Sequence, residues 1–187
     1  LPIILISYHE ESKLLLFNFF ERQKQRMKCI NSNSEFAIIR DETCEHVQFG
    51  LFLLIRYGYH ITMQKSGYYK FSPKKNLIEA TYLNPTTNAI STLFCGYDDT
   101  MSPSTMLQLS IALSLSIEDA FDWFLVCGHN LSSSSRKMRG YMHLLYLTLP
   151  QNPEKIYSKE ESRGQIDIAQ DWSDKNHFET IRSKKLN

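Results

Sequence analysis

Apolar side chains recur at the spacing of amphipathic helices over residues 47–150. The first segment has one apolar face, made of Phe49, Phe52, Leu53, Ile55 and Tyr59. A later segment carries Met106, Leu107, Leu109, Ile111, Ala112, Leu113 and Leu115. Because a helix that packs on a core shows three or four apolar residues every two turns, the pattern predicts a mainly α-helical domain over 47–150.

Serine, proline and glycine mark the predicted ends of two of these helices. Ser102-Pro103 places a hydroxyl at the N-cap and a proline at the first helical position, which is a usual helix start. Ser116 and Asp119 resemble a capping box, with Asp in place of Glu, for the next helix. Gly128 can adopt the left-handed conformation that ends a helix, so we expect that helix to end near Cys127.

The same signals predict three further helices. Ser72-Pro73 opens one over residues 73–82, Thr86 caps one over 86–94, and the serines at 132–135 precede one over 136–149. The bundle therefore has five or six helices. The segment from Tyr68 to Phe71, ahead of them, fits either a short strand or an ordered loop.

The first 46 residues follow a different pattern. Ile3 to Ser7 and Phe36 to Arg40 are β-branched runs that predict strands, and Glu10 to Lys28 predicts a helix between them. Residues 1–46 thus read as a small β-α-β element, too short to bury a core of its own.

The last segment, 151–187, is rich in Glu, Lys, Ser, Asp and Gln. We expect a polar C-terminal arm that is only partly ordered and draped on the surface. A short amphipathic arm that docks a partner is the alternative.

Composition narrows the functional classes. Apolar residues make up 42% of the chain, which excludes wholesale disorder. The 21 Lys and Arg nearly balance the 20 Asp and Glu, which excludes a strongly basic nucleic-acid binder but leaves a locally basic one. No apolar run is long enough to span a membrane, so we expect a cytoplasmic protein without a membrane partner.

The spacing of the cysteines and histidines does not predict a catalytic or metal site. The four cysteines are widely spaced and form no CxxC pair, so we expect buried thiols and no metal, even at Cys44-Glu45-His46. Cys127 and His129 invite a thiol–imidazole pair, and His9 follows the first predicted strand, yet neither has an accompanying catalytic motif. His143 reads as a half-buried packing residue. We expect neither catalysis nor a cofactor.

The helices between residues 77 and 120 carry a more specific pattern. Ala80 is small where the next helix must cross closely, and Leu83-Asn84 suits a turn that needs a left-handed residue. Thr86 then caps a helix whose Ile90 and Leu93 face the core. These features resemble a lambda-repressor-like, Cro-type helix-turn-helix domain.

Residues 102–147 resemble one bacterial branch of that superfamily. The shared pattern is Ser102, Thr105, Leu109, Ala112, Leu113, Leu115, Ala120 and Gly128, followed by Ser132 to Ser135, Arg136 and Lys137. In that branch the domain often follows another domain, which would suit the stretch before Val47. The resemblance covers about residues 47–147.

The resemblance implies a DNA-binding transcriptional regulator of bacterial or phage type, acting as a dimer on double-stranded DNA. The helix Thr86–Phe94 would lie in a major groove. The DNA-binding residues would be Lys74, Lys75, Asn76, Thr86, Thr87, Asn88, Ser91 and Thr92, with Lys74 and Lys75 on phosphates. Further phosphate contacts would come from Lys70, Arg136, Lys137 and Arg139.

A second hypothesis uses the same fold without reading DNA. Thr, Asn and Ser are ordinary residues at a helix start, and the expected Arg or Gln is absent from Thr86–Phe94. Asp98-Asp99 would repel a phosphate backbone. The aromatic residues exceed what a small core requires: Phe121, Trp123, Phe124, Tyr141 and Tyr146. These features favour a protein-protein interaction module, an inhibitor or adaptor.

Overall fold

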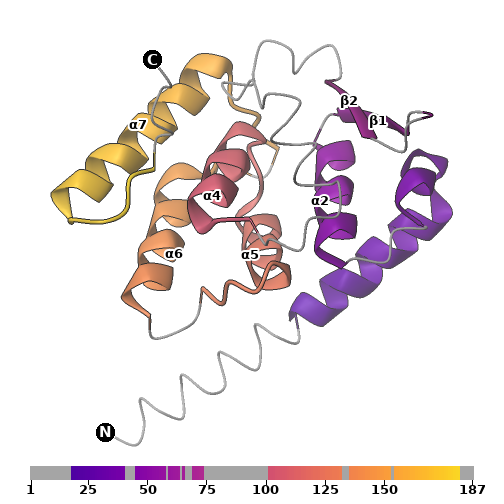
Figure 1. The fold of residues 1–187 in the computed structure, drawn as a ribbon, viewed down its shortest axis with the longest axis horizontal. Coiled ribbons are helices and arrows are strands. Elements are labelled where there is room, and N and C mark those ends of the chain that lie inside the picture. Colours follow the sequence, from indigo (N-terminus) through magenta and orange to yellow (C-terminus); the bar gives the residue numbers. More distant parts are fainter. Residues whose placement is uncertain are drawn as a thin grey trace, which may run out of the picture. The chain divides into compact units, whose positions relative to one another are not determined.

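The computed structural model describes residues 18–40, 45–57, 59–63, 65, 69–73, 101–131, 135–152 and 154–181. The chain forms two compact units, Leu1–Asp41 and Glu42–Asn187. The sequence prediction placed this boundary after residue 46, which lies inside the first helix of the second unit. Most described residues are helical, as Figure 1 shows, so the prediction of a mainly α protein is confirmed.

The first unit contains a helix over residues 18–32 and the 3-10 helix η1 (Ser34–Ile39). The predicted strand from Phe36 to Arg40 is therefore wrong. The Asn33 side chain accepts a hydrogen bond from the Glu35 amide at 2.9 Å and so starts a helical turn. An i to i+3 repeat then puts Phe36 and Ile39 on one buried side, and local capping outweighs β-branching. The predicted strand at residues 3–7 lies outside the described residues.

The second unit begins with α2 (Glu45–Arg56), followed by a two-stranded sheet of β1 (Tyr59–Met63) and β2 (Tyr69–Pro73). The strands are antiparallel, and Ile61 pairs with Phe71. The residues of the predicted apolar face of α2 are buried, but so is every other residue from Phe49 to Ile55, so the burial is not confined to one face. Tyr59 belongs to β1, where it is also buried. Pro73, predicted as the first residue of a helix, belongs to β2 and pairs with Tyr59. The rest of that helix and the one predicted over 86–94 lie in the 74–100 stretch, outside the described residues.

Three helices follow in the order that the sequence predicts: α4 (Pro103–Ala112), α5 (Ile117–Val126) and α6 (Arg136–Thr148). The hydroxyl oxygens of Ser102 and Ser116 accept capping hydrogen bonds from the amides three residues later, at 3.3 and 3.2 Å. Gly128 has φ = 80° and ends the α5 region. These local predictions are confirmed because each depends only on neighbouring residues.

The segment predicted as a partly ordered arm contains a 17-residue helix, α7 (Lys159–Lys175). It begins with a complete capping box between Ser158 and Glu161. Its inward stripe is made of small or aliphatic residues, all buried: Ser162, Ile166, Ala169 and Ser173. Small side chains allow close approach, and α7 contacts both α4 and α6 (Figure 1).

Tyr157 anchors the segment between α6 and α7 through two hydrogen bonds, one to the turn between α4 and α5 and one to the end of α6. Its amide donates to Ser114 Oγ at 2.8 Å, in the turn between α4 and α5. Its hydroxyl donates to the carbonyl oxygen of Thr148 at 3.0 Å. Ser114 and Thr148 are both buried, so these bonds satisfy polar atoms that water cannot reach.

Candidate functional site

Most of the residues expected to contact DNA lie outside the described residues. These are Lys74, Lys75, Asn76, Thr86, Thr87, Asn88, Ser91 and Thr92. Lys70 lies in β2, where its backbone pairs with Thr62. Arg136 and Lys137 are described, and they begin α6 together with Arg139.

The start of α6 is a concentrated basic surface. Arg136, Lys137 and Arg139 are all exposed, and the first turn of α6 contains no carboxylate. The amide groups at the start of a helix add partial positive charge. Two of the three cations reach the segment after α7: Arg136 Nη2 donates to the Asn176 carbonyl oxygen at 3.4 Å, and Lys137 Nζ pairs with Glu179 at 2.6 Å.

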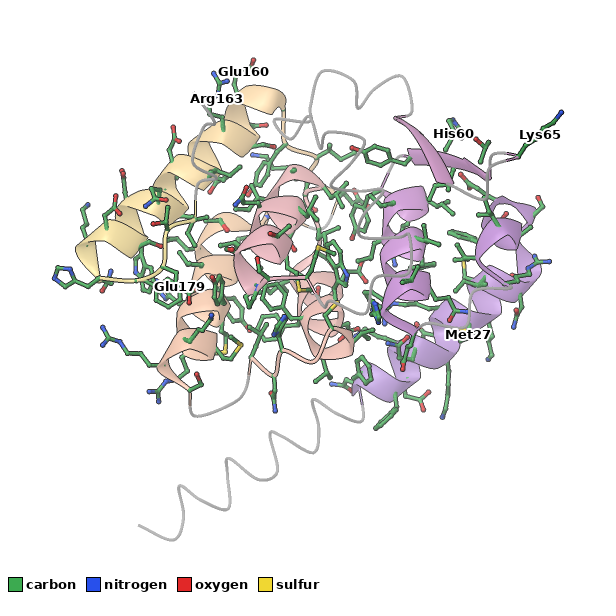
Figure 2. All side chains as sticks on the ribbon, in the orientation of Figure 1. Met27, His60, Lys65, Glu160, Arg163 and Glu179 are labelled. Carbon is green, nitrogen blue, oxygen red and sulfur yellow. The ribbon has the colours of Figure 1, made fainter. Side chains whose placement is uncertain are left out.

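Residues 176–181, which we call the C-terminal strap, return from the end of α7 across α6. The Phe178 ring packs edge-on against Tyr141, with centroids 5.2 Å apart. A β-carbon added at Gly140 would lie 2.6 Å from Phe178 Cζ, so glycine is what lets the ring approach α6. Figure 2 labels Glu179, between α7 and α6.

Ile181 fixes the far end of the strap. It is buried, its amide donates to Gln170 Oε1 at 2.9 Å, and its carbonyl oxygen accepts from Gln108 Nε2. Gln108 lies on α4 and Gln170 on α7, so the strap joins helices that are distant in sequence.

Glu179 is held by two donors on α6. Tyr141 Oη donates to Glu179 Oε2 at 2.6 Å, and Lys137 Nζ lies 2.6 Å from the other oxygen, Oε1. Burial raises the pKa of Tyr141 well above its usual value, and the bond to Glu179 adds to this. Burial also acts to raise the pKa of Glu179, but the bonds from Lys137 and Tyr141 outweigh it, and the net pKa is lowered. At neutral pH the group is an anion held by a hydroxyl and an ammonium.

A second cluster joins the end of α2 to the start of α5. Tyr57 Oη donates to Asp119 Oδ2 at 2.6 Å, and Arg56 Nη1 lies 3.6 Å from the same oxygen. The Ser116 amide donates to Tyr57 Oη at 3.2 Å. Burial, followed by the charge of Asp119, raises the pKa of Tyr57 to about 12.

Sequence reasoning missed both clusters. It assigned Asp119 to a capping box, although its carboxylate bonds to Tyr57, a residue 62 positions away. Glu179 lay in the segment expected to be an arm. Asp119 and Glu179 are each a charged residue close to apolar ones in the sequence, and that pattern is too common to identify a contact.

Two of the histidines considered for chemistry, His129 and His143, have structural partners, and His9 lies outside the described residues. His129 Nε2 lies 2.8 Å from the carbonyl oxygen of Met101, and its ring packs near Phe124, so it ties the end of the α5 region to the residue before the α4 cap. His143 packs against Trp172 with ring centroids 4.9 Å apart, but it is exposed and not half-buried as predicted. Within the described ranges, no group of three or more His, Cys, Asp or Glu could hold a metal ion.

The aromatic residues expected at an interface divide into two sets. Trp123, Phe124 and Tyr141 are buried in the core. Phe121 and Tyr146 lie nearer the surface, with ring centroids 5.6 Å apart, and Tyr146 is exposed. Fewer of these aromatic residues are therefore available to an interface than the sequence suggested. The exposed apolar residues of α6 and α7 are Tyr146, Leu147 and Ile168.

None of the described helices combines the length and apolar character needed to cross a bilayer. Comparison of the chain with protein-family models, with curated proteins and with solved structures gave no match.

Proposed function

We propose that the second unit binds double-stranded DNA through a helix-turn-helix and acts as a dimeric transcriptional regulator of bacterial or phage type. The observation that carries the proposal is the basic start of α6. Arg136, Lys137 and Arg139 stand within four positions of one another on an exposed helix start. Such a surface is suited to backbone phosphates, which Arg and Lys contact most often.

The helix boundaries add support. The resemblance to repressor domains expects helices that begin after Ser102 and after Ser116, and α4 and α5 begin there. In this proposal the helix over 86–94 supplies base contacts through Thr87 and Asn88, and the start of α6 supplies phosphate contacts. The balanced charge of the chain implies few released counterions, and therefore a shallow dependence of affinity on salt.

The experiment is selection from a pool of random duplexes at two salt concentrations. We expect one sequence to be enriched, and Asn88→Ala to relax that enrichment. Arg136→Gln combined with Lys137→Gln should weaken binding to all sequences and reduce the slope of log affinity against log salt by about 1 to 2. Arg163→Gln is the matched control, because Arg163 is an exposed cation near the start of α7, away from Glu179 (Figure 2). A pool with no enrichment would refute the proposal.

An interaction module is the second candidate, and the exposed apolar residues on α6 and α7 favour it. Tyr146, Leu147 and Ile168 are each more than two-fifths exposed. Apolar and aromatic side chains at a surface are typical of protein interfaces. In this case, affinity capture with the full chain should recover a partner that Tyr146→Ser with Ile168→Ser loses, while duplex selection gives no enrichment.

A further inference from the structure

The carboxylate of Glu179 accepts a hydrogen bond from Tyr141 and pairs with Lys137, a residue that the proposed function assigns to a DNA phosphate. We propose that Tyr141, Lys137 and Arg136 form a site for a nucleic-acid backbone phosphate, which Glu179 of the C-terminal strap occupies when no nucleic acid is bound. This inference rests on the proposed DNA binding and adds a competitor within the chain. Tyr141 is a new member of the site, since the sequence assigned it to an aromatic interface.

The two donors reach the two carboxylate oxygens separately. Tyr141 Oη contacts Oε2 and Lys137 Nζ contacts Oε1, each at 2.6 Å. A phosphodiester also presents two unesterified oxygens and one negative charge, so it can accept the same two bonds. Tyrosine hydroxyls and lysine ammonium groups are both common donors to backbone phosphates.

Arg136 supplies a third donor beside this pair. Its Nη2 donates to the carbonyl oxygen of Asn176 at 3.4 Å, a long bond to a neutral acceptor. A phosphate is a stronger acceptor for a guanidinium than a carbonyl oxygen is, because both partners are then charged. Exchange of the Glu179 side chain for a phosphate therefore gives Arg136 a charged acceptor within reach and preserves the charge opposite Lys137.

Glu179 can leave without release of the whole strap. Its side chain is 44% exposed and ends a flexible chain of single bonds, and an exposed ion pair of this kind contributes little to stability. Other residues hold the strap backbone: Phe178 packs against Tyr141, and Ile181 bonds to Gln108 and Gln170. Rotation of the Glu179 side chain removes the carboxylate from the hydroxyl of Tyr141, a residue that is otherwise fully buried.

The test is fluorescence anisotropy with a labelled duplex and the full chain, at low and at moderate salt. Glu179→Ala removes the competitor, and Glu160→Ala removes an exposed carboxylate near the start of α7 (Figure 2). We expect Glu179→Ala to tighten binding by about threefold to tenfold at low salt and to steepen the salt slope by about 1, because one more phosphate is contacted. Glu160→Ala should change affinity much less.

Two further variants identify the donors. Lys137→Gln or Tyr141→Phe, each added to Glu179→Ala, should remove most of the gain, and thermal unfolding verifies that each variant is folded. If the wild-type chain binds duplex and Glu179→Ala behaves like Glu160→Ala, the competition is refuted and DNA binding stands.

Titration with inorganic phosphate separates the remaining outcomes. If no variant binds duplex but Glu179→Ala binds phosphate in a manner that depends on Lys137, the anion site stands and DNA binding falls. If neither duplex nor phosphate binds to Glu179→Ala, both proposals are overturned.

Discussion

Two tyrosine–carboxylate pairs in the second unit have the same oxygen–oxygen distance, 2.6 Å, and very different surroundings. The side chain of Asp119 is 5% exposed, whereas that of Glu179 is 44% exposed. Asp119 lies in the first turn of α5, while Glu179 lies in the strap beyond α7. Hydrogen-bond length alone therefore does not distinguish a structural contact from an exchangeable one; the burial and anchoring of the acceptor do.

The difference has an energetic origin. When a donor to a buried carboxylate is removed, the charge loses a partner that water cannot replace. When a donor to an exposed carboxylate is removed, water takes its place and little is lost. On this basis Tyr57–Asp119 holds α2 to α5, and Tyr141–Glu179 can open.

The largest expected effect contrasts the two tyrosines directly. Tyr57→Phe should lower the free energy of unfolding by about 2 to 3 kcal/mol, because Asp119 stays buried after losing its hydroxyl donor. Tyr141→Phe should cost about 1 kcal/mol or less, since Glu179 keeps Lys137 and water. Urea unfolding followed by circular dichroism measures both. Equal losses would contradict the distinction.

Alkaline pH tests the Tyr57 pair without mutation. The pKa of Tyr57 is raised from 10.0 to about 12, so its stabilising contribution is complete below pH 10 and is lost as pH rises through 12. After allowance for its partial exposure, the loss amounts to about 2 kcal/mol. Urea unfolding between pH 8 and pH 12 should show it, and Tyr57→Phe should lose that part of the slope. An unchanged slope would mean that Tyr57 does not titrate in this way.

Substitutions at two glycines test how closely Phe178 of the strap packs against α6. Gly140→Ala places a β-carbon against Phe178, and displacement of the ring should outweigh the gain in helix propensity, for a net loss of about 1 kcal/mol. Gly164→Ala on α7 meets nothing within 4 Å and should stabilise the chain by about 0.5 to 1 kcal/mol. Thermal unfolding gives both signs, and limited proteolysis should detect the released strap only in Gly140→Ala. Stabilisation by both substitutions would show that Phe178 yields without cost.

Acid pH should produce the smallest effect. The pKa of Glu179 is lowered from 4.5, so its contribution is present above pH 4.5 and is lost as pH falls through the lower folded value. Because the side chain is 44% exposed and water screens its charge, the loss should stay under about 0.5 kcal/mol. The difference in melting temperature between wild type and Glu179→Gln, followed from pH 6 to pH 3, measures it. A difference larger than that of Tyr57→Phe would reverse the comparison.

Sequence was a good guide where the determinants are local. Ser102 and Ser116 cap helices through bonds to amides three residues away, and Gly128 ends one through its own backbone angle. Such features can be read from four or five consecutive residues. The helix α2 could also be predicted from its apolar residues, although its burial extends over more than the predicted face.

The sequence was a poor guide where two local patterns compete, or where two contacting residues are far apart along the chain. The β-branched run after Asn33 suggested a strand, but the Asn33 side chain starts a 3-10 turn there. The polar composition of 151–187 concealed α7, whose buried stripe is made of small residues that a hydrophobic pattern does not reveal. No periodicity could indicate that Glu179 meets Tyr141.

The candidate site was predicted only in part. Arg136 and Lys137 are exposed at a helix start, as expected of phosphate contacts, but their bonds to the strap were not foreseen. Whether the helix over 86–94 reads DNA stays a prediction, because those residues lie outside the part of the chain that the structure describes.

The buried stripe of α7 has a practical consequence for the choice of fragments. The sequence alone recommends cutting after Pro150, where the predicted bundle ends. A recombinant fragment cut there would lose Tyr157, and with it the partner of Ser114, and would expose to solvent the sides of α4 and α6 that α7 covers. We expect that fragment to aggregate during purification, whereas one that continues past Ile181 retains the whole assembly of helices.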